Sequence, residues 1–75
     1  MVTGHREPAP DRGNVKRMCE RHGTHLGTCY HSGTQYWVCD GRVWEIGADT
    51  AVQWGDYFEF MQYVRDGQIS GWIAA

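Results

Sequence analysis

The dipeptide Asp40-Gly41 constrains the fold of this chain more than any other feature. It separates two runs in which apolar and polar side chains alternate, Thr34–Cys39 and Arg42–Ile46. Such alternation is typical of half-buried strands, and Asp-Gly favours a type I′ turn because both central residues of that turn need a positive φ. We therefore predict an antiparallel hairpin centred on residues 40 and 41.

A third alternating run, Leu26–His31, precedes Ser32-Gly33 and extends the hairpin into a meander. If both loops contain two residues, Leu26 pairs with Cys39 and Trp37 pairs with Trp44. Alternate residues of a strand point to opposite faces of the sheet, so this register defines two faces. The first contains Leu26, Thr28, Tyr30, Gln35, Trp37, Cys39, Arg42, Trp44 and Ile46, and the second contains Cys29, His31, Thr34, Tyr36, Val38, Val43 and Glu45. The first face, with both tryptophans, is predicted to be the core side.

The C-terminal stretch 56–67 is predicted to form a helix that covers this core face. Asp56 followed by Glu59 resembles a capping box, and Gly67 stands where a left-handed residue would end the helix. The apolar residues between them recur at helical spacing, namely Tyr57, Phe60, Met61 and Val64. The predicted fold is therefore α+β, a three-stranded antiparallel meander packed by one C-terminal helix.

A second interpretation treats the aromatic stretch Tyr57–Val64 as a strand. Residues 65–68 would then turn the chain into a further strand at Ile69–Ile73, and the fold would be a small all-β barrel. The stretch Ala51–Trp54 has two interpretations as well. It is either an additional strand or the first turn of a longer helix, with Gly55 favouring a break.

The N-terminal residues 1–13 are predicted to be a flexible leader, and residues 14–75 a single small α+β domain. Both prolines, Pro8 and Pro10, lie in the leader and favour extended backbone before them. The stretch Asn14–Glu20 fits a short helix capped by Asn14, or a strand, and Gly23 ends it in either case. A chain of 75 residues allows one domain only.

Charge is distributed unevenly along the chain, whose net charge is −2. Residues 1–25 contain five basic and three acidic residues, whereas residues 26–75 contain two basic and six acidic ones. A basic arm on an acidic body is typical of segments that contact nucleic acid or an acidic partner. A solvated leader without a partner is the simpler interpretation.

The three cysteines, Cys19, Cys29 and Cys39, follow no apolar run of the kind found in a secretory leader. No window of the sequence reaches the roughly 18 apolar residues that a membrane span requires. We therefore expect a cytoplasmic protein with reduced thiols and no membrane contact.

Cysteines and histidines cluster between residues 19 and 39 at a spacing that suits zinc. Cys19 and His22 are separated by two residues, which lets one tight turn present both ligands. The run Tyr36–Cys39 resembles the second half of a zinc ribbon, in which an aromatic strand delivers a cysteine; the resemblance covers about a third of the chain. In such ribbons a further ligand follows where this chain has Arg42. The predicted ligands of one zinc ion are therefore Cys19, His22, Cys39 and His25.

Two alternatives to a zinc site stay open. In the first, the thiols are free and buried as small apolar groups, and the histidines are solvated. In the second, Cys19 and Cys29 form a disulfide.

Catalytic signals are weak, and we predict that the chain is not an enzyme. Cys29 and His31 share a strand face, but a pair two residues apart arises readily by chance. No nucleophile elbow, phosphate loop or dinucleotide motif is present in the sequence.

The predicted function is binding. In the first hypothesis the chain is a small regulatory protein, an inhibitor or adaptor, that contacts a larger protein partner through Tyr36, Val38 and Val43 on the second sheet face. In the second it is a zinc-ribbon-like module that binds nucleic acid. Its phosphate contacts would be Arg17 and Arg21, together with Arg12 and Lys16.

Overall fold

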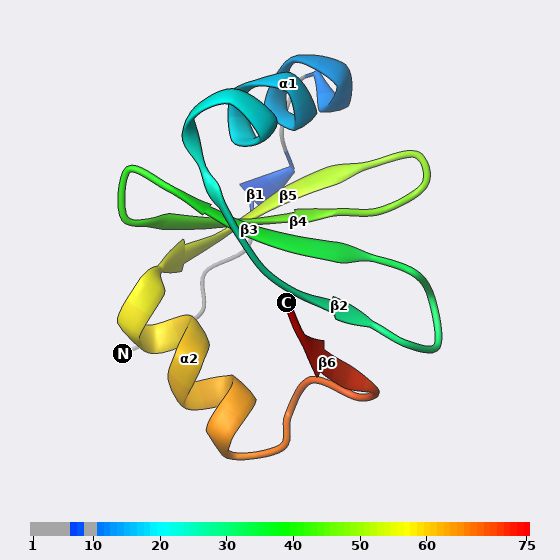
Figure 1. The fold of residues 1–75 in the computed structure, drawn as a ribbon, viewed down its shortest axis with the longest axis vertical. Coiled ribbons are helices and arrows are strands. Elements are labelled where there is room, and N and C mark those ends of the chain that lie inside the picture. The colour runs from blue at the N-terminus through cyan, green and yellow to red at the C-terminus, as the bar shows by residue number, and fades with distance from the viewer. Residues whose placement is uncertain (1–6, 9–10) are drawn as a thin grey trace.

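The computed structural model describes residues 7–8 and 11–75, which form an antiparallel sheet between two helices (Figure 1). The strands are β1 (Glu7–Pro8), β2 (Thr24–Cys29), β3 (Gln35–Cys39), β4 (Arg42–Ile46), β5 (Ala51–Asp56) and β6 (Trp72–Ala74), and the helices are α1 (Arg12–His22) and α2 (Tyr57–Arg65). Their order across the sheet is β1-β5-β4-β3-β2-β6. The α+β class is confirmed. The sheet is larger than the predicted meander, a second helix is present, and the all-β barrel is wrong because residues 57–65 are helical.

The central hairpin has the predicted register. Trp37 lies opposite Trp44, and Cys39 lies opposite Arg42. Asp40 has a φ of 54° and Gly41 a φ of 75°, the pair of positive values that this turn requires. The two indole rings therefore share one face of the sheet.

The register predicted between β2 and β3 is wrong. His25 lies opposite Trp37 and Thr28 opposite Gln35, with a bulge at Leu26 between His25 and Gly27. The loop between the strands is longer than two residues. Within it, the amide of Gly33 donates to the carbonyl of Cys29 at 2.8 Å. Because the bulge shifts the alternation, Leu26 packs on the opposite face from Trp37.

Helix α1 begins earlier than predicted. Its N-cap is Asp11, whose carboxylate accepts a hydrogen bond from the amide of Asn14 at 3.1 Å, so Asn14 is not the cap. Gly23 ends the helix as expected. Within the predicted leader 1–13, Glu7–Pro8 pair with β5 and residues 12–13 belong to α1. The rest of that prediction lies outside the described residues.

The two helices pack on opposite faces of the sheet, as Figure 1 shows. Helix α1 covers the tryptophan face, where the buried residues are Val15, Cys19, Cys39, Ile46 and Ala51, flanked by Met18, Trp37 and Trp44. Helix α2 covers the other face, where Tyr36, Val43 and Phe60 are buried. The prediction that the C-terminal helix covers the tryptophans is therefore wrong, although its apolar stripe does point inward.

The local geometry of β5 explains where α2 lies. A bulge at Trp54 separates the pairs Val43–Gly55 and Trp44–Gln53, and Gly55 has a φ of 121°. The amide of Tyr57 then donates to the carbonyl of Gly41 at 2.9 Å, which ties the start of α2 to the β3–β4 turn. Neither helix of the described residues has the length and apolar character needed to cross a membrane.

Candidate functional site

Two of the predicted zinc ligands, Cys19 and Cys39, lie together in the cluster under α1. Cys19 is fully buried and Cys39 nearly so. Burial, and then the nearby Cys39, raise the pKa of Cys19 from its ordinary value of 9.0 to about 11. These surroundings favour the protonated form of the Cys19 thiol.

The two histidines of the predicted site do not join these cysteines. His22 is exposed at the end of α1. The ring of His25 stacks on Trp37 with centroids 4.8 Å apart, and its Nε2 lies 3.0 Å from the carbonyl oxygen of Gly27. Over residues 7–8 and 11–75, no group of three or more His, Cys, Asp or Glu side chains is placed to hold a metal ion.

The sheet face predicted to contact a partner is covered by α2 and β6. Tyr36 and Val43 are 6% and 0% exposed, and the Tyr36 ring lies 5.2 Å from Phe60 and 5.6 Å from Trp72 between centroids. The expectation that this face is open is therefore wrong. Of the three predicted residues, Val38 lines one surface hollow and Tyr36 borders another, beside Cys29 and Trp54.

Arg17 and Arg21, the predicted basic contacts, are exposed on the outer side of α1. The guanidinium of Arg17 donates to the side-chain oxygen of Asn14 in the first turn. Both residues lie on the side of α1 that points away from the sheet, and their role as partner contacts stays a prediction.

A surface that sequence reasoning missed lies at the start of α2. Phe58 is 80% exposed, and its ring meets Tyr57 edge-on at 5.6 Å between centroids. It borders a hollow of about 500 Å³ whose other lining residues are Thr24, Leu26, Val38, Gly41, Asp56 and Tyr57. We call Phe58 and this hollow the Phe58 surface. The one sequence signal for it is that Phe58 falls outside the apolar stripe of its helix.

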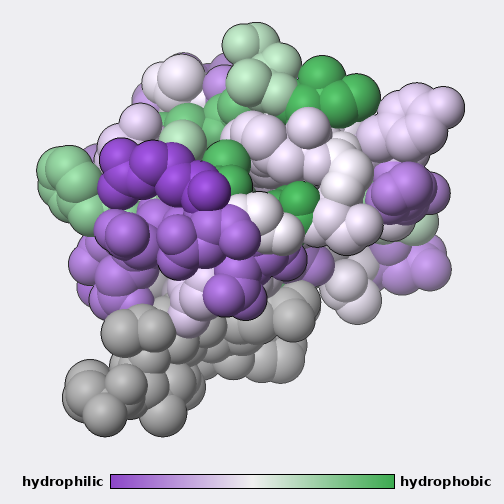
Figure 2. Space-filling view, turned by 90° about the horizontal axis from the view of Figure 1, so that it is seen from below, coloured by the Kyte–Doolittle hydropathy of each residue, from purple (hydrophilic) through white to green (hydrophobic). Residues whose placement is uncertain are grey.

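The Phe58 ring also borders a second hollow, of about 340 Å³, along the outer side of α2. Glu59, Gln62, Tyr63 and Asp66 line it. Figure 2, which views the molecule from the α2 side, shows hydrophobic groups along the margins of a strongly hydrophilic area. The exposed ring thus stands between an apolar hollow and a polar, acidic one.

The pKa of Cys29 is lowered, but within the part of the chain that the structure describes no histidine ring hydrogen-bonds to its thiol. Hydrogen bonds from Ser32, first through its hydroxyl and then through its backbone amide, lower the pKa of Cys29, and the protonated thiol donates to the carbonyl of Ser70 at 3.1 Å. His31 contributes through its backbone, while its ring packs against Tyr30 and Gly71. This arrangement lacks the positioned base that a cysteine nucleophile requires.

Among these places, the Phe58 surface has the largest hollow and the most exposed aromatic side chain. It is built by residues from several elements, among them Leu26 of β2, Val38 of β3 and Tyr57 of α2. No protein-family model, curated protein or solved structure matches the chain.

Proposed function

We propose that the chain is a small non-catalytic module that binds a larger protein through the Phe58 surface. The observation that supports this proposal is the 80% exposure of Phe58 beside an apolar hollow. Burying such a side chain is worth roughly 1.5–3 kcal/mol, which is available to a partner that covers it. Aromatic anchors beside pockets are typical of the energetic centres of protein interfaces.

The charges around Phe58 indicate the chemistry of the partner. Asp56 and Glu59 lie within one turn of the ring, and Asp66 lies at the far end of α2, where Arg65 is the one basic side chain of that helix. We therefore expect a partner segment with an aliphatic or aromatic anchor flanked by lysine or arginine.

The position of Phe58 is held before any partner arrives. The Asp56 carboxylate accepts from the amide of Glu59 at 2.8 Å, which caps the helix, and Phe60 is 1% exposed beneath it. Because the helix start is also tied to Gly41, little backbone freedom remains to be lost on binding.

The proposal places the module in the cytoplasm. Cys19, Cys29 and Cys39 are all free thiols, which reducing compartments preserve.

The test uses selection from a randomised peptide library against the full chain. Selected peptides are expected to share an apolar anchor with flanking basic residues, and Phe58→Ala is expected to weaken their binding at least about tenfold. Tyr30→Ala is the matched control, because Tyr30 is another exposed aromatic, at 73%, in the β2–β3 loop.

Equal binding by wild type and Phe58→Ala would overturn the proposal, as would equal losses in Phe58→Ala and Tyr30→Ala. Light scattering on the chain alone adds a separate outcome. A dimer that Phe58→Ala converts to monomer would assign the surface to a second copy of the chain and exclude the larger partner. Circular dichroism of each variant establishes that the fold is intact.

A further inference from the structure

A small polar pocket lies on the opposite face of the sheet from Phe58, between α1 and two loops. It has a volume of about 160 Å³ and is lined by Arg12 and Lys16 of α1, Ser32 and Gly33 of the β2–β3 loop, and Gly47 and Ala48 after β4. We propose that this pocket binds one tetrahedral oxyanion, either inorganic phosphate or the terminal phosphoryl group of a small molecule. The proposal is independent of the function assigned to the Phe58 surface.

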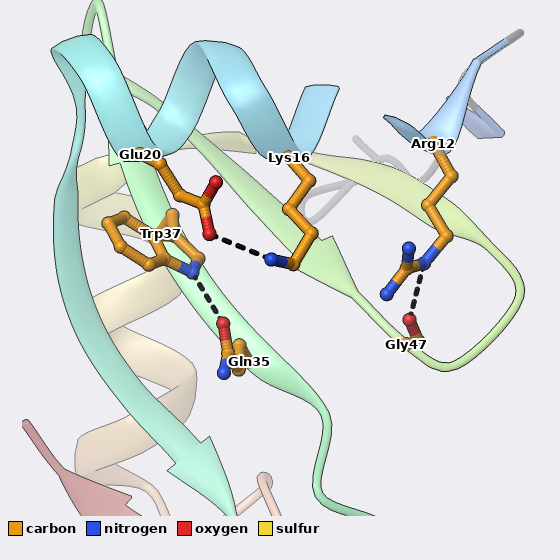
Figure 3. Close-up of polar contacts among 6 residues, drawn as sticks. All are labelled: Arg12, Lys16, Glu20, Gln35, Trp37 and Gly47. Carbon is orange, nitrogen blue, oxygen red and sulfur yellow. Dashed lines mark hydrogen bonds and ion pairs between the residues drawn. The ribbon is translucent and has the colours of Figure 1, made fainter. Parts of the chain in front are cut away.

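The two cations reach the pocket from consecutive turns of the same helix. Arg12 and Lys16 are four residues apart, and both side chains descend from α1 toward the loops, as Figure 3 shows. The Nε of Arg12 donates to the carbonyl of Gly47 at 2.6 Å, a contact that is partly buried. Among the described residues, the Arg12 guanidinium donates this one hydrogen bond, through Nε. Its two terminal nitrogens therefore remain as a pair of donors that an oxyanion can accept from.

Glu20 is a competitor for the second cation. The Nζ of Lys16 lies 2.7 Å from the Oε2 of Glu20, and the two side chains are 40% and 47% exposed. Figure 3 shows this carboxylate beside the Trp37 ring, on the side of Lys16 away from Arg12. Exposed pairs of this type are weak, so an anion with a higher charge can draw Lys16 away from Glu20.

The size and charge of the pocket indicate a phosphoryl group. Its volume is below the roughly 300–1,000 Å³ of pockets for larger ligands, and it suits a single small group. A phosphate monoester has a charge of about −1.5 to −2 at pH 7, which matches two cations better than one carboxylate does. Gly33 and Gly47 bring backbone rather than side chains to the far wall, which allows close approach.

The experiment titrates the ¹⁵N-labelled full chain with inorganic phosphate, with chloride adjusted to keep ionic strength constant. Saturable shifts are expected at the amides of Gly33, Gly47 and Ala48. Arg12→Gln and Lys16→Gln should each weaken binding about tenfold, the usual effect of removing one charge-assisted hydrogen bond. Glu20→Gln should tighten it several-fold, because Lys16 is then released.

Arg17→Gln and Arg21→Gln are matched controls. They remove the same charge from the same helix, but both residues lie on its outer side, so their effect should stay below about twofold at physiological salt. If these controls weaken binding as much as Arg12→Gln, the attraction is general and the pocket proposal fails. An absence of saturable shifts would also overturn it.

Two further arms test whether the pocket takes a terminal phosphoryl group. Phenyl phosphate should bind about as well as inorganic phosphate, whereas a dinucleoside monophosphate, whose one phosphate has two organic substituents, should not saturate the pocket. Equal binding of the dinucleoside monophosphate would overturn the proposal of a terminal phosphoryl group. Thermal melting establishes that each variant is folded. If Arg12→Gln unfolds because it loses the contact to Gly47, Lys16→Gln and Glu20→Gln still decide the test.

Discussion

The two faces of the sheet are packed in different ways although the same strands build both. On the α1 face the buried side chains are small, such as Val15, Cys19 and Ala51, and the two central tryptophans are only partly buried. On the α2 face large rings meet around Phe60. A chain of this length that has no disulfide among its cysteines thus builds two thin cores, and the aromatic one buries more area per residue.

The outer surfaces of the two helices differ in the same way. Helix α1 presents four basic side chains, and its small pocket suits an oxyanion, whereas α2 presents an exposed phenylalanine between acidic neighbours. Each helix therefore stabilises one face of the sheet and offers a different chemistry to the solvent. The following predictions test whether the two faces contribute unequally.

The largest effect is expected from Phe60→Ala. The ring is 1% exposed and lies within 5.7 Å of Tyr36, Trp54 and Trp72 between centroids, so its loss leaves a cavity that costs about 3–5 kcal/mol. Val15→Ala on the α1 face should cost about 2 kcal/mol. Urea denaturation followed by tryptophan fluorescence measures both, and equal losses would show that the two cores contribute equally.

Adding one methyl group should change the free energy of unfolding in opposite directions at two glycines, Gly27 beside β6 and Gly13 in α1. At Gly27 a Cβ would lie 2.5 Å from the Trp72 ring and 2.6 Å from the carbonyl oxygen of Ile73, so Gly27→Ala should cost about 1–3 kcal/mol and loosen β6. At Gly13 in α1 the nearest atom is 3.4 Å away, and Gly13→Ala should stabilise the chain by about 0.5–1 kcal/mol. Amide exchange of β6 should accelerate in Gly27→Ala alone; a stable Gly27→Ala with protected β6 amides would contradict the close packing of Trp72.

The parts of the fold that the sequence predicts are those with local causes. The Asp40-Gly41 turn needs only two residues with positive φ, and the Asp56 cap and the stripe of α2 lie within one segment. The turn and the helix were therefore predictable, and so was the register between β3 and β4. The pairing of β2 with β3 was not, because the bulge at Leu26 depends on a loop closed by contacts between strands.

The choice of face failed for a different reason. Residues of β3 are apolar on both sides, with Tyr36 and Val38 on one and Trp37 and Cys39 on the other, so alternation alone does not say which helix covers which face. The predicted contact residues Tyr36 and Val43 became core residues in consequence. The predicted ligands separated because the shifted register of β2 stacks His25 on Trp37 rather than placing it beside Cys19.

Removing the helix caps should have a moderate effect that differs in extent between the two helices. Asp11 and Asp56 each accept a backbone amide of the first turn, and replacement by alanine should cost about 1 kcal/mol in either case. Since Phe60 lies on α2, we expect Asp56→Ala to lower the free energy of global unfolding, whereas Asp11→Ala should mainly speed local exchange in α1. Hydrogen exchange along both helices distinguishes these outcomes, and global loss in Asp11→Ala alone would reverse the ranking of the two cores.

The smallest effect on stability comes from two cysteines, Cys19 on the α1 face and Cys29 on the α2 face, and it is absent at neutral pH. Burial raises the pKa of Cys19 to about 11, so above pH 9 the unfolded chain loses this proton while the folded chain keeps it. Stability should therefore fall as the pH rises from 9 to 11, and Cys19→Ala should flatten that fall.

Cys29 should act in the opposite direction. Its pKa is lowered by hydrogen bonds from Ser32, so its thiolate forms earlier in the folded chain and contributes stability as the pH rises toward 9. Cys29→Ala should thus remove a rise in stability that is complete near pH 9, and it should leave in place the decline from pH 9 to 11 that Cys19→Ala flattens. Melting temperatures of both variants at several alkaline pH values measure the difference, and because lysines and tyrosines titrate in every variant, only the differences between variants report on the thiols. Parallel curves for the two variants would contradict the opposite pKa shifts of the two thiols, and with them the dry surroundings of Cys19 under α1.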